Sequence, residues 1–574
     1  MTDLTPPQLH DAAPWSSITE SMDCPRVQPG PSTCLGILEQ FDRGDRDRVA
    51  VLFESARLTV SDVTAMVGRC AGWLQSVGVG AGDRVLVALG NTPQFLVYSL
   101  AAWRVGAIVV PANPMYRSTE LRAILGDCSP AVAVCTDANL PAIRGVLDEL
   151  DTACTVVLDE DDALRDGLPG RWAGPDGHSP DRVVASPVVL GHPPVADPAP
   201  EALPSDTAVL CYTSGTTGPP KGAMVTHGAL AFTARVYRDW LGLDAADVVL
   251  GAAPMAHITG IACNLITPLL VECPVILPGR FDPATALDLI EQHEATLLLG
   301  SATIFTALML HAEDGSDRLR SIRRAYSGGA PVAPALVNRF RSRFGIEIRT
   351  CYGLTETCGP AHFAPPVGEL PVDVETGALA VGLPIYDSEV AILDADGRPL
   401  PPGHAGEIVI RGPHVFAGYW NNPDETAHAL RDGWLRSGDV GLMDESGWFY
   451  VVDRLKDQIN ASGYKVWPRE VEDVLLAHPD VLEVAVVGVP DSYRGESVVA
   501  CVSRTPGSLV TAEELRAHCR ALLAAYKVPV RIDLVEELPK TFSGKIKRST
   551  IRAQLAAPAA EFTLTVEDQA KDPQ

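Results

Sequence analysis

Short, uniformly apolar segments alternate with amphipathic helical patterns through the first third of the chain. The apolar segments lie at residues 84–89, 107–110, 131–134 and 155–158, and the helical patterns at 62–77, at 94–105 and from residue 118 onward. Strands that are apolar on both faces are typical of parallel sheets covered by helices on each side. The alternation therefore predicts βαβ units for this part of the chain.

The pattern changes twice further along. A second apolar block spans residues 207–352, a β-rich stretch with many glycine turns spans 381–450, and a compact α+β pattern begins after residue 457. We expect an α/β and α+β protein, in which a large N-terminal domain of βαβ-type sheets with a β-rich subdomain is joined to a small, mobile C-terminal α+β domain. The expected divisions are an N-terminal extension and start of the first domain at 1–57, the large domain at 58–455, the small lid domain at 457–555 and a flexible tail at 556–574. Residues 160–205, which contain nine prolines, are expected to form a surface connection without helix or central strand.

Composition excludes several classes of protein. Among the 574 residues, 46% are hydrophobic and 21% are charged, which is typical of globular proteins and not of disordered or fibrous ones. The net charge of −26 repels nucleic-acid phosphates and anionic membranes, so we expect no nucleic-acid partner. The longest apolar window, residues 260–279, contains Asn264, Pro268, Glu272 and Pro274, and it favours a buried helix followed by a buried strand over a membrane span.

The cysteines and the N-terminus indicate a compartment. The 13 cysteines show neither CxxC nor CxxH spacing, so we expect neither a disulfide framework nor a zinc site. The first residues carry two acids and no base before an apolar run, unlike a secretory or transit peptide. We therefore expect a reduced, cytoplasmic protein that is a monomer or a homodimer.

The segment with the clearest chemical meaning is residues 212–222, Tyr-Thr-Ser-Gly-Thr-Thr-Gly-Pro-Pro-Lys-Gly. It follows an apolar strand at 207–212, and we expect it to precede a helix with Tyr237 on its apolar face. Its hydroxyls, glycines and lysine form a strip of donors suited to phosphate oxygens, although the spacing is not that of a Walker A loop. The predicted phosphate ligands are Thr213, Ser214, Gly215, Thr216, Thr217, Gly218 and Lys221.

This segment resembles the phosphate loop of the ANL superfamily of adenylate-forming enzymes, which contains acyl-CoA synthetases, adenylation domains of peptide synthetases and firefly-type luciferases. Further motifs follow in the order of that family, at residues 254–257, 327–331, 351–356, 406–412, 418–420, 433–439, 453–457, 462–465 and 539–545. The resemblance covers residues 58–552. It implies an AMP-forming acyl-CoA synthetase that uses ATP, Mg²⁺ and coenzyme A.

The chemistry implied by the resemblance brings two anions together. An ionised carboxylic acid must approach the α-phosphate of ATP, so the site needs positive charge and oriented donors. By resemblance, Lys545 bridges the carboxylate and the α-phosphate, Glu356 holds Mg²⁺ together with Thr213, and His257 orients the carboxylate without acting as a base. The resemblance also implies a nucleotide site built from Gly328, Gly329, Ala330, Pro331, Cys351, Tyr352, Gly353, Leu354, Thr355, Asp439 and Arg454, with Asp439 receiving the ribose hydroxyls.

Two half-reactions need two environments, because pyrophosphate must leave before the thiol of coenzyme A enters. In the family, the small domain rotates about one hinge residue, to which Lys456 corresponds. The resemblance places Ser462, Gly463 and Tyr464 along the tunnel for the pantetheine arm, where a glycine permits close passage.

The residues of the implied acyl pocket carry no formal charge. They are His257, Ile258, Thr259, Cys263, Ser301, Thr303, Gly328, Gly353 and Cys358. A second carboxylate on the substrate would require an arginine or lysine, so we expect a neutral apolar acid. The resemblance is closest to bacterial medium- and long-chain fatty acid CoA ligases. Aryl acids such as benzoates or cinnamates remain an alternative, as does an acyl-AMP ligase that loads a separate carrier protein.

Overall fold

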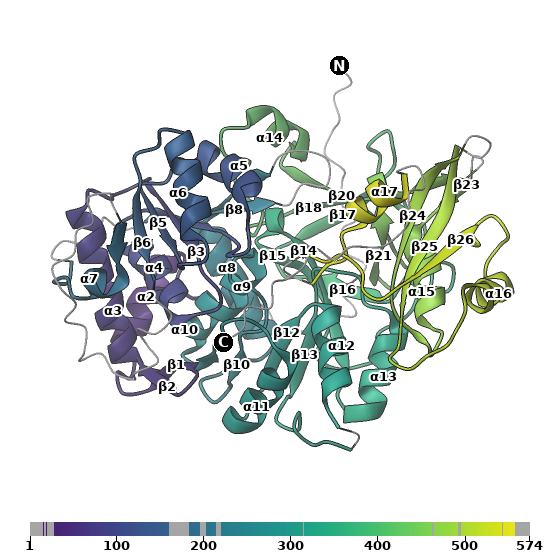
Figure 1. Ribbon diagram of the computed structural model, residues 1–574, viewed down its shortest axis with the longest axis horizontal. Helices are drawn as coiled ribbons and strands as arrows, with labels where there is room; N and C mark the ends of the chain where they lie inside the picture. Colours follow the sequence, from purple (N-terminus) through teal and green to yellow (C-terminus); the bar gives the residue numbers. More distant parts are fainter. Residues whose placement is uncertain are drawn as a thin grey trace.

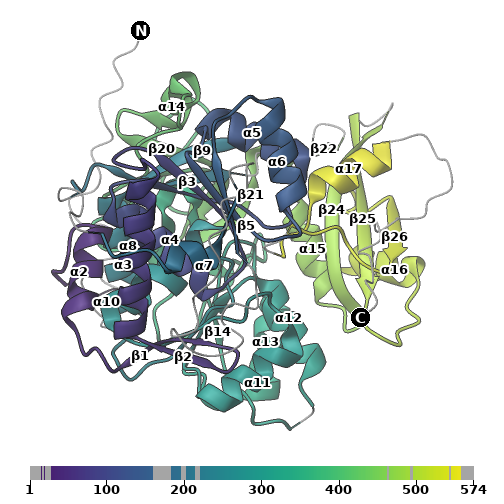
Figure 2. The same ribbon diagram turned by 60° about the vertical axis from the view of Figure 1, so that its left-hand side comes forward.

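The computed structural model shows a large α/β domain and a small α+β domain, and in two views the small domain lies at one end of the large one (Figures 1 and 2). The structure describes residues 15, 19, 28–159, 183–195, 202–213, 220–313, 315–461, 464–491, 495–541 and 544–556. The predicted fold class is confirmed. The described residues form three sheets, two in the large domain and one in the small domain.

The first sheet contains the predicted βαβ units. Its order is β7-β6-β5-β3-β4-β8-β9, and its strands are parallel except for the antiparallel pair β8 and β9. The strands are β3 (Arg84–Ala88), β4 (Ile108–Pro111), β5 (Val132–Cys135), β6 (Thr155–Leu158), β7 (Val183–Ala185), β8 (Thr207–Thr213) and β9 (Lys221–Thr226). The accompanying helices are α3 (Val60–Ser76), α4 (Pro93–Arg104), α5 (Ser118–Cys128), α6 (Leu140–Glu149) and α7 (Ser186–Leu190).

Alternate residues of each central strand enter different cores. In β3, Val85 and Val87 belong to the cluster that includes α3 and α4, whereas Leu86 and Ala88 belong to the cluster that includes α5 and α6. Both faces of this strand are thus buried, which is why its sequence is apolar throughout.

Residues 160–205 were expected to contain neither a helix nor a central strand, and the expectation was wrong for the helix, while the one strand described there lies at the edge of the sheet. Residues 183–185 form β7, which pairs in parallel with β6, and α7 follows directly. A short apolar run suffices for an edge strand, because only one side needs a hydrogen-bonding neighbour. Residues 160–182 and 196–201 lie outside the described residues.

The second sheet runs through the centre of the molecule in the order β17-β18-β20-β21-β16-β15-β14-β13-β12-β10-β11-β1-β2, with β19 beside β20. Strands β10 to β14 pair in parallel, and the sheet continues antiparallel from β15 to β21. The strands are β1 (Val49–Phe53), β2 (Ala56–Thr59), β10 (Val249–Leu250), β11 (Val275–Ile276), β12 (Leu297–Gly300), β13 (Arg324–Ser327), β14 (Ile348–Leu354), β15 (Gly359–Phe363), β16 (Ala380–Pro384), β17 (Glu389–Leu393), β18 (Gly406–Arg411), β19 (Leu430–Arg431), β20 (Trp434–Met443) and β21 (Phe449–Arg454).

The helices of this part include the apolar window at 260–279. As predicted, the window is a buried helical segment followed by a buried strand, here α9 (Ile258–Gly260), the π-helix η2 (Ile261–Ile266), α10 (Thr267–Val271) and β11. No helix in the described part of the chain is long and apolar enough to span a membrane. The remaining helices are α2 (Cys34–Arg43), α8 (His227–Trp240), α11 (Pro283–His293), α12 (Ala302–His311), α13 (Pro334–Phe344), η3 (Thr355–Thr357) and α14 (Pro423–Ala429).

The small domain has its own sheet and core. Strands β23, β22, β25 and β24 are neighbours, and β26 pairs with β25. Its elements are β22 (Ile459–Ala461), β23 (Tyr464–Val466), α15 (Pro468–Leu476), β24 (Val481–Asp491), β25 (Gly495–Arg504), α16 (Ala512–Leu522), β26 (Arg531–Val535) and α17 (Arg548–Ala556). The 3₁₀ turn η4 (Leu455–Asp457) connects the domains, and the proposed hinge residue lies within it.

Candidate active site

Several predicted site segments follow neighbouring parallel strands. Register pairs Gly300 with Ser327 and Ser327 with Thr350, so β12 and β13 end side by side and β14 continues past them to Leu354. Ligands of open α/β sheets bind outside the carboxyl ends of their strands. The segments at 301–303, 328–331 and 351–356 meet at this edge.

The predicted ribose acid is buried and has two side-chain partners, one of which, Arg454, remains partly exposed. The Tyr352 hydroxyl donates to Asp439 Oδ2 at 2.8 Å, and Arg454 Nε lies 3.2 Å from Asp439 Oδ1. Antiparallel pairing of β20 and β21 places Asp439 opposite Arg454. Burial raises the pKa of Asp439, against the opposing effects of Arg454 and the tyrosine hydrogen bond. A carboxylate has lone pairs for further donors, so this one retains acceptor capacity for hydroxyls.

The carboxylate of Glu356, the predicted metal ligand, has a hydrogen-bond partner on one of its two oxygens. Tyr419 donates its hydroxyl to Glu356 Oε1 at 2.6 Å, and the Phe416 amide donates to the Glu356 carbonyl at 2.9 Å. Among the described residues, Glu356 Oε2 has no hydrogen-bond donor. One oxygen of the carboxylate is therefore fixed, and the other is available to a cation or to water.

Lys545 reaches this site from the small domain. A Cβ added to Gly329 would lie 3.3 Å from Lys545 Cε, so the lysine stem packs on the bare glycine backbone, whose φ is +78°. Although the residue as a whole retains solvent contact, burial of the ammonium group and the nearby Arg454 lower its pKa to about 8. Asp439 and Glu356 act in the opposite direction. The ammonium is thus within electrostatic range of both predicted acids.

His257 stands at the start of the short helix α9, where it is the N-cap residue. Burial and the positive charge of Lys545 lower the pKa of its imidazole to about 4. A neutral imidazole near pH 7 fits an orienting role and adds no charge to the site.

Close backbone packing forms the predicted acyl wall. A Cβ on Gly328 would lie 2.5 Å from Cys351 Sγ, and one on Gly353 would overlap the carbonyl oxygen of Gly359. The hydroxyls of Ser301 and Thr303 lie 2.7 Å apart. Only glycine, which has no side chain, permits the close approaches at Gly328 and Gly353.

The structure adds a residue that the motif comparison missed. Tyr237 in α8 is 1% exposed, and a Cβ on Gly359 would lie 3.8 Å from its hydroxyl. Burial, and proximity to Cys263, Cys351 and Cys358, raise its pKa well above the ordinary value. Its ring packs edge-on against that of Phe363, with the ring centroids 5.4 Å apart. The sequence signal that could have identified Tyr237 is its place on the apolar face of a helix. A tyrosine buried there brings a polar hydroxyl group into an apolar region, and such a group normally has a hydrogen-bond partner.

The phosphate segment differs from its expected form. Thr213 ends β8, but Lys221 and Gly222 begin β9 and pair back to Thr213 and Tyr212, so a hairpin precedes the helix. Lys221 forms an ion pair with Glu425 and lies 5.3 Å from the ring centroid of Tyr419. The predicted ligands Ser214, Gly215, Thr216, Thr217 and Gly218 lie outside the described residues.

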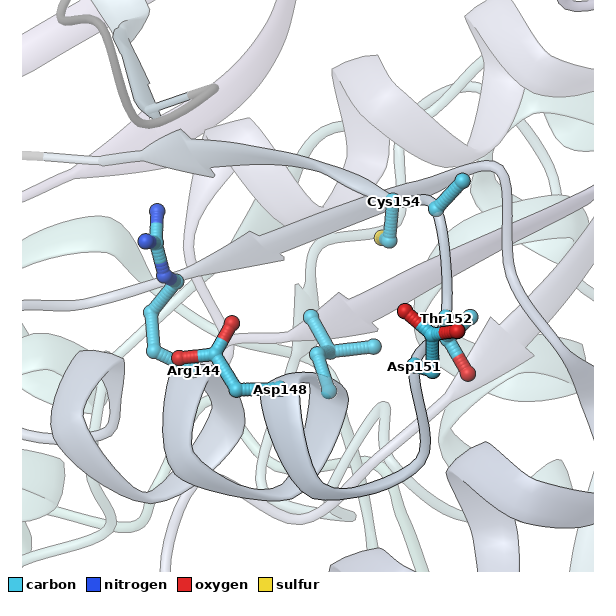
Figure 3. Close-up of a pocket in the computed structure, with 7 residues that line it drawn as sticks. Arg144, Asp148, Asp151, Thr152 and Cys154 are labelled. Atoms are coloured by element: carbon cyan, nitrogen blue, oxygen red, sulfur yellow. The ribbon is translucent and has the colours of Figure 1, made fainter.

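Of the predicted tunnel residues, Tyr464 is described, and its ring stacks on that of Tyr526 at 4.6 Å. Ser462 and Gly463 lie outside the described residues. A hollow elsewhere, lined by Arg144, Asp148 and Asp151 at the end of α6, contains none of the predicted site residues (Figure 3).

Comparisons with known proteins identify the family of this chain. The AMP-binding enzyme family matches residues 38–420, and the AMP-binding enzyme C-terminal domain matches residues 470–545. The chain is 35% identical to a long-chain-fatty-acid–CoA ligase of Bacillus subtilis, over 94% of this chain and 98% of that protein. It is also 35% identical to a feruloyl-CoA synthase of Amycolatopsis, over 88% and 95%. The crystal structure of ATP-bound MatB from Rhodopseudomonas palustris superposes with a TM-score of 0.80 at 28% identity, covering 91% of this chain and 99% of that one.

Proposed function

We propose an acid substrate and roles for the site residues on the premise that this chain belongs to the AMP-binding enzyme family. The chain is an AMP-forming acyl-CoA ligase, and ATP, a carboxylic acid and CoA are its substrates. We infer that the acid is neutral and apolar, foremost a medium- or long-chain fatty acid. The observation that supports the residue roles is the docking of Lys545 on Gly329, near Glu356 and Asp439.

Lys545 is the proposed catalytic cation. A carboxylate oxygen attacks the α-phosphorus of ATP, the P–O bond to pyrophosphate breaks, and acyl-AMP forms. Negative charge accumulates where the two anions meet, and an ammonium group at that point lowers the barrier. His257, which is neutral, orients the carboxylate without removing a proton.

Glu356, with Thr213, is the proposed holder of Mg²⁺. The carboxylate has one oxygen fixed by Tyr419 and one without a donor among the described residues, which fits a hard cation that also takes phosphate oxygens. Bound Mg²⁺ would neutralise charge on the phosphates. Tyr419 keeps the Glu356 carboxylate in one orientation.

The nucleotide is assigned to the edge formed by the strand ends. Asp439 accepts the ribose hydroxyls, and Arg454 contacts ribose or phosphate. The remaining proposed contacts are those of the phosphate segment at 213–221 and of Gly328, Gly329, Ala330, Pro331, Cys351, Tyr352, Gly353, Leu354 and Thr355.

The acyl group is assigned to the wall that contains Ile258, Thr259 and Cys263. Its members lack charge, and burial keeps the Cys263 and Cys358 thiols neutral by raising the pKa of each. A neutral wall stabilises an apolar chain and gives a second carboxylate no partner.

A second candidate is an aryl acid with a distal hydroxyl group. The observations that favour it are the similarity to a feruloyl-CoA synthase and the position of the Tyr237 hydroxyl beside Gly359, where it could form a hydrogen bond with such a substrate.

A panel of acids tests these alternatives. Aliphatic acids of increasing length and hydroxylated and unsubstituted cinnamates are compared by acid-dependent AMP release with CoA, in the natural enzyme and in Tyr237→Phe. A fatty acid substrate predicts activity that rises with chain length and is unaffected by Tyr237→Phe. Activity only with dicarboxylates or amino acids would contradict the proposal.

Between the half-reactions, we propose that the small domain turns at Lys456 and brings Ser462, Gly463 and Tyr464 toward the acyl-AMP. The withdrawal of Lys545 and entry of a thiol at the same position would account for a two-step reaction. We further propose a cytoplasmic location, because none of the described cysteines forms a disulfide.

A further inference from the structure

A buried carboxylate of the large domain receives donors from the small domain. Asp453, in β21, is 6% exposed. Its Oδ2 accepts the Arg469 amide at 3.0 Å, and its Oδ1 lies 3.4 Å from Arg548 Nη1. Its remaining donor is the amide of Arg454 at 2.8 Å. Two of the three described donors to Asp453 therefore come from across the connection between the domains.

Arg469 enters the large domain more deeply. It is 3% exposed, and its Nη1 donates to the Val451 carbonyl at 2.6 Å, while Nη2 lies 3.5 Å from the Val332 carbonyl. Val332 directly follows the nucleotide segment at 328–331. One guanidinium thus joins the start of the small domain to a segment of the candidate site.

Arg548 is three residues beyond Lys545 and begins α17. Within the small domain it is held by Glu472, at 2.5 Å from Nη2, and lies 3.8 Å from Asp457. These two pairs would move with the small domain, whereas the pair with Asp453 joins the small domain to the large one.

We propose that Arg548 and Arg469 are positioning residues, which act through Asp453 and the neighbouring carbonyls to dock the small domain so that Lys545 lies on Gly329. This inference rests on the proposed function of Lys545. Among the described residues, the side chains of these arginines contact none of the predicted substrate-binding residues. Removing one partner of a buried ion pair leaves an uncompensated charge in the docked orientation of the domains. In an orientation where the Asp453 carboxylate is solvated, water compensates that charge, so the docked orientation alone is destabilised.

The first test separates the half-reactions. Arg548→Gln and Asp453→Asn are compared with Arg552→Gln, a matched control on the same helix, because Arg552 pairs with Asp457 inside the small domain at 3.2 Å. Pyrophosphate exchange is expected to fall about tenfold or more in the first two variants. Thioester formation from supplied acyl-AMP is expected to change by less than about twofold, and Arg548→Lys should recover part of the exchange rate. Equal loss in both half-reactions would overturn the proposal.

The second test does not depend on the substrate. Spin labels at Val374→Cys and Leu509→Cys, which replace side chains that are 97% and 87% exposed in the two domains, report the distance between them by pulsed electron resonance. Labelling of the parent chain serves as the background. One main distance is expected in the natural enzyme and in Arg552→Gln, and a second population in Arg548→Gln. An unchanged distribution in Arg548→Gln would overturn the docking role, whereas absence of acyl-AMP with every acid would contradict the proposed function alone.

Discussion

Asp439 illustrates how single residues define this site. Its buried carboxylate is held between the Tyr352 hydroxyl and the Arg454 guanidinium, and burial still raises its pKa. The charge is compensated on both sides before any nucleotide arrives. A pre-oriented acceptor loses little freedom when a ribose binds.

Tyr352→Phe tests this arrangement. Loss of the hydroxyl leaves the ring and removes one donor from a buried carboxylate, so we expect the KM for ATP to rise about tenfold. The KM for CoA should stay unchanged. Tyr450→Phe is the control, since it removes a similar hydrogen bond, to Asp444 at 2.9 Å, outside the site. Equal effects of the two variants on ATP would contradict the assignment.

Buried histidines predict acid sensitivity. Burial lowers the pKa of His362 to about 3 and that of His414 to about 4, against about 6.5 in an unfolded chain. The unfolded state therefore binds more protons below pH 6.5, and the free energy of unfolding should fall as pH decreases from about 6.5 toward 4. Each histidine contributes a slope of about 1.4 kcal/mol per pH unit.

Urea unfolding at several pH values measures that slope. His362→Phe keeps an aromatic ring beside Phe449, whose centroid lies 4.7 Å from that of His362, and should reduce the slope by about one proton. An unaltered slope in this variant would show that His362 is not a source of the acid sensitivity.

At the scale of elements, periodicity predicted more than loop chemistry did. Strands β3, β4, β5, β6 and β8 of the first sheet were predicted to within a few residues, because burial imposes a simple apolar pattern on them. The hairpin of β8 and β9 was missed, because Lys221 and Gly222 are typical loop residues. They can nevertheless begin β9, because this edge strand forms hydrogen bonds with only one neighbouring strand, β8. The resemblance identified Gly353 and Cys358, which lie beside Gly359. It did not identify Tyr237, because that residue is far from these motifs in the sequence.

Gly353→Ala tests the close pairing of β14 with β15. The added methyl group would overlap the Gly359 carbonyl, so the strands must separate, at a cost of about 1–3 kcal/mol of folding free energy. Gly145→Ala, in α6, is the control, because an added Cβ meets nothing within 4 Å. Thermal unfolding should show a lower midpoint for Gly353→Ala only. Equal midpoints would contradict the packing described for this pair.

The whole molecule joins two domains through η4, and the orientation seen here brings Lys545 to the site. The resemblance predicted both the lysine and the connection, but no single stretch of sequence revealed that Arg469 and Arg548 meet Asp453 from positions far along the chain. Such contacts depend on tertiary placement and leave no local pattern.

Lys456→Pro tests the proposed turning of the domain. Proline fixes one backbone dihedral at the connection and restricts its rotation. We expect thioester formation to slow while pyrophosphate exchange is retained. The opposite pattern, slow exchange with normal thioester formation, would place the hinge elsewhere.

The most direct measurement of the central claim compares both half-reactions in Lys545→Ala. Removing the ammonium group should lower acyl-AMP formation by about a hundredfold or more, as expected when a charge that stabilises the transition state is lost. Thioester formation from supplied acyl-AMP and CoA should be much less affected. If the two half-reactions fell equally, or if acyl-AMP formation persisted, Lys545 would not be the group that brings the two anions together.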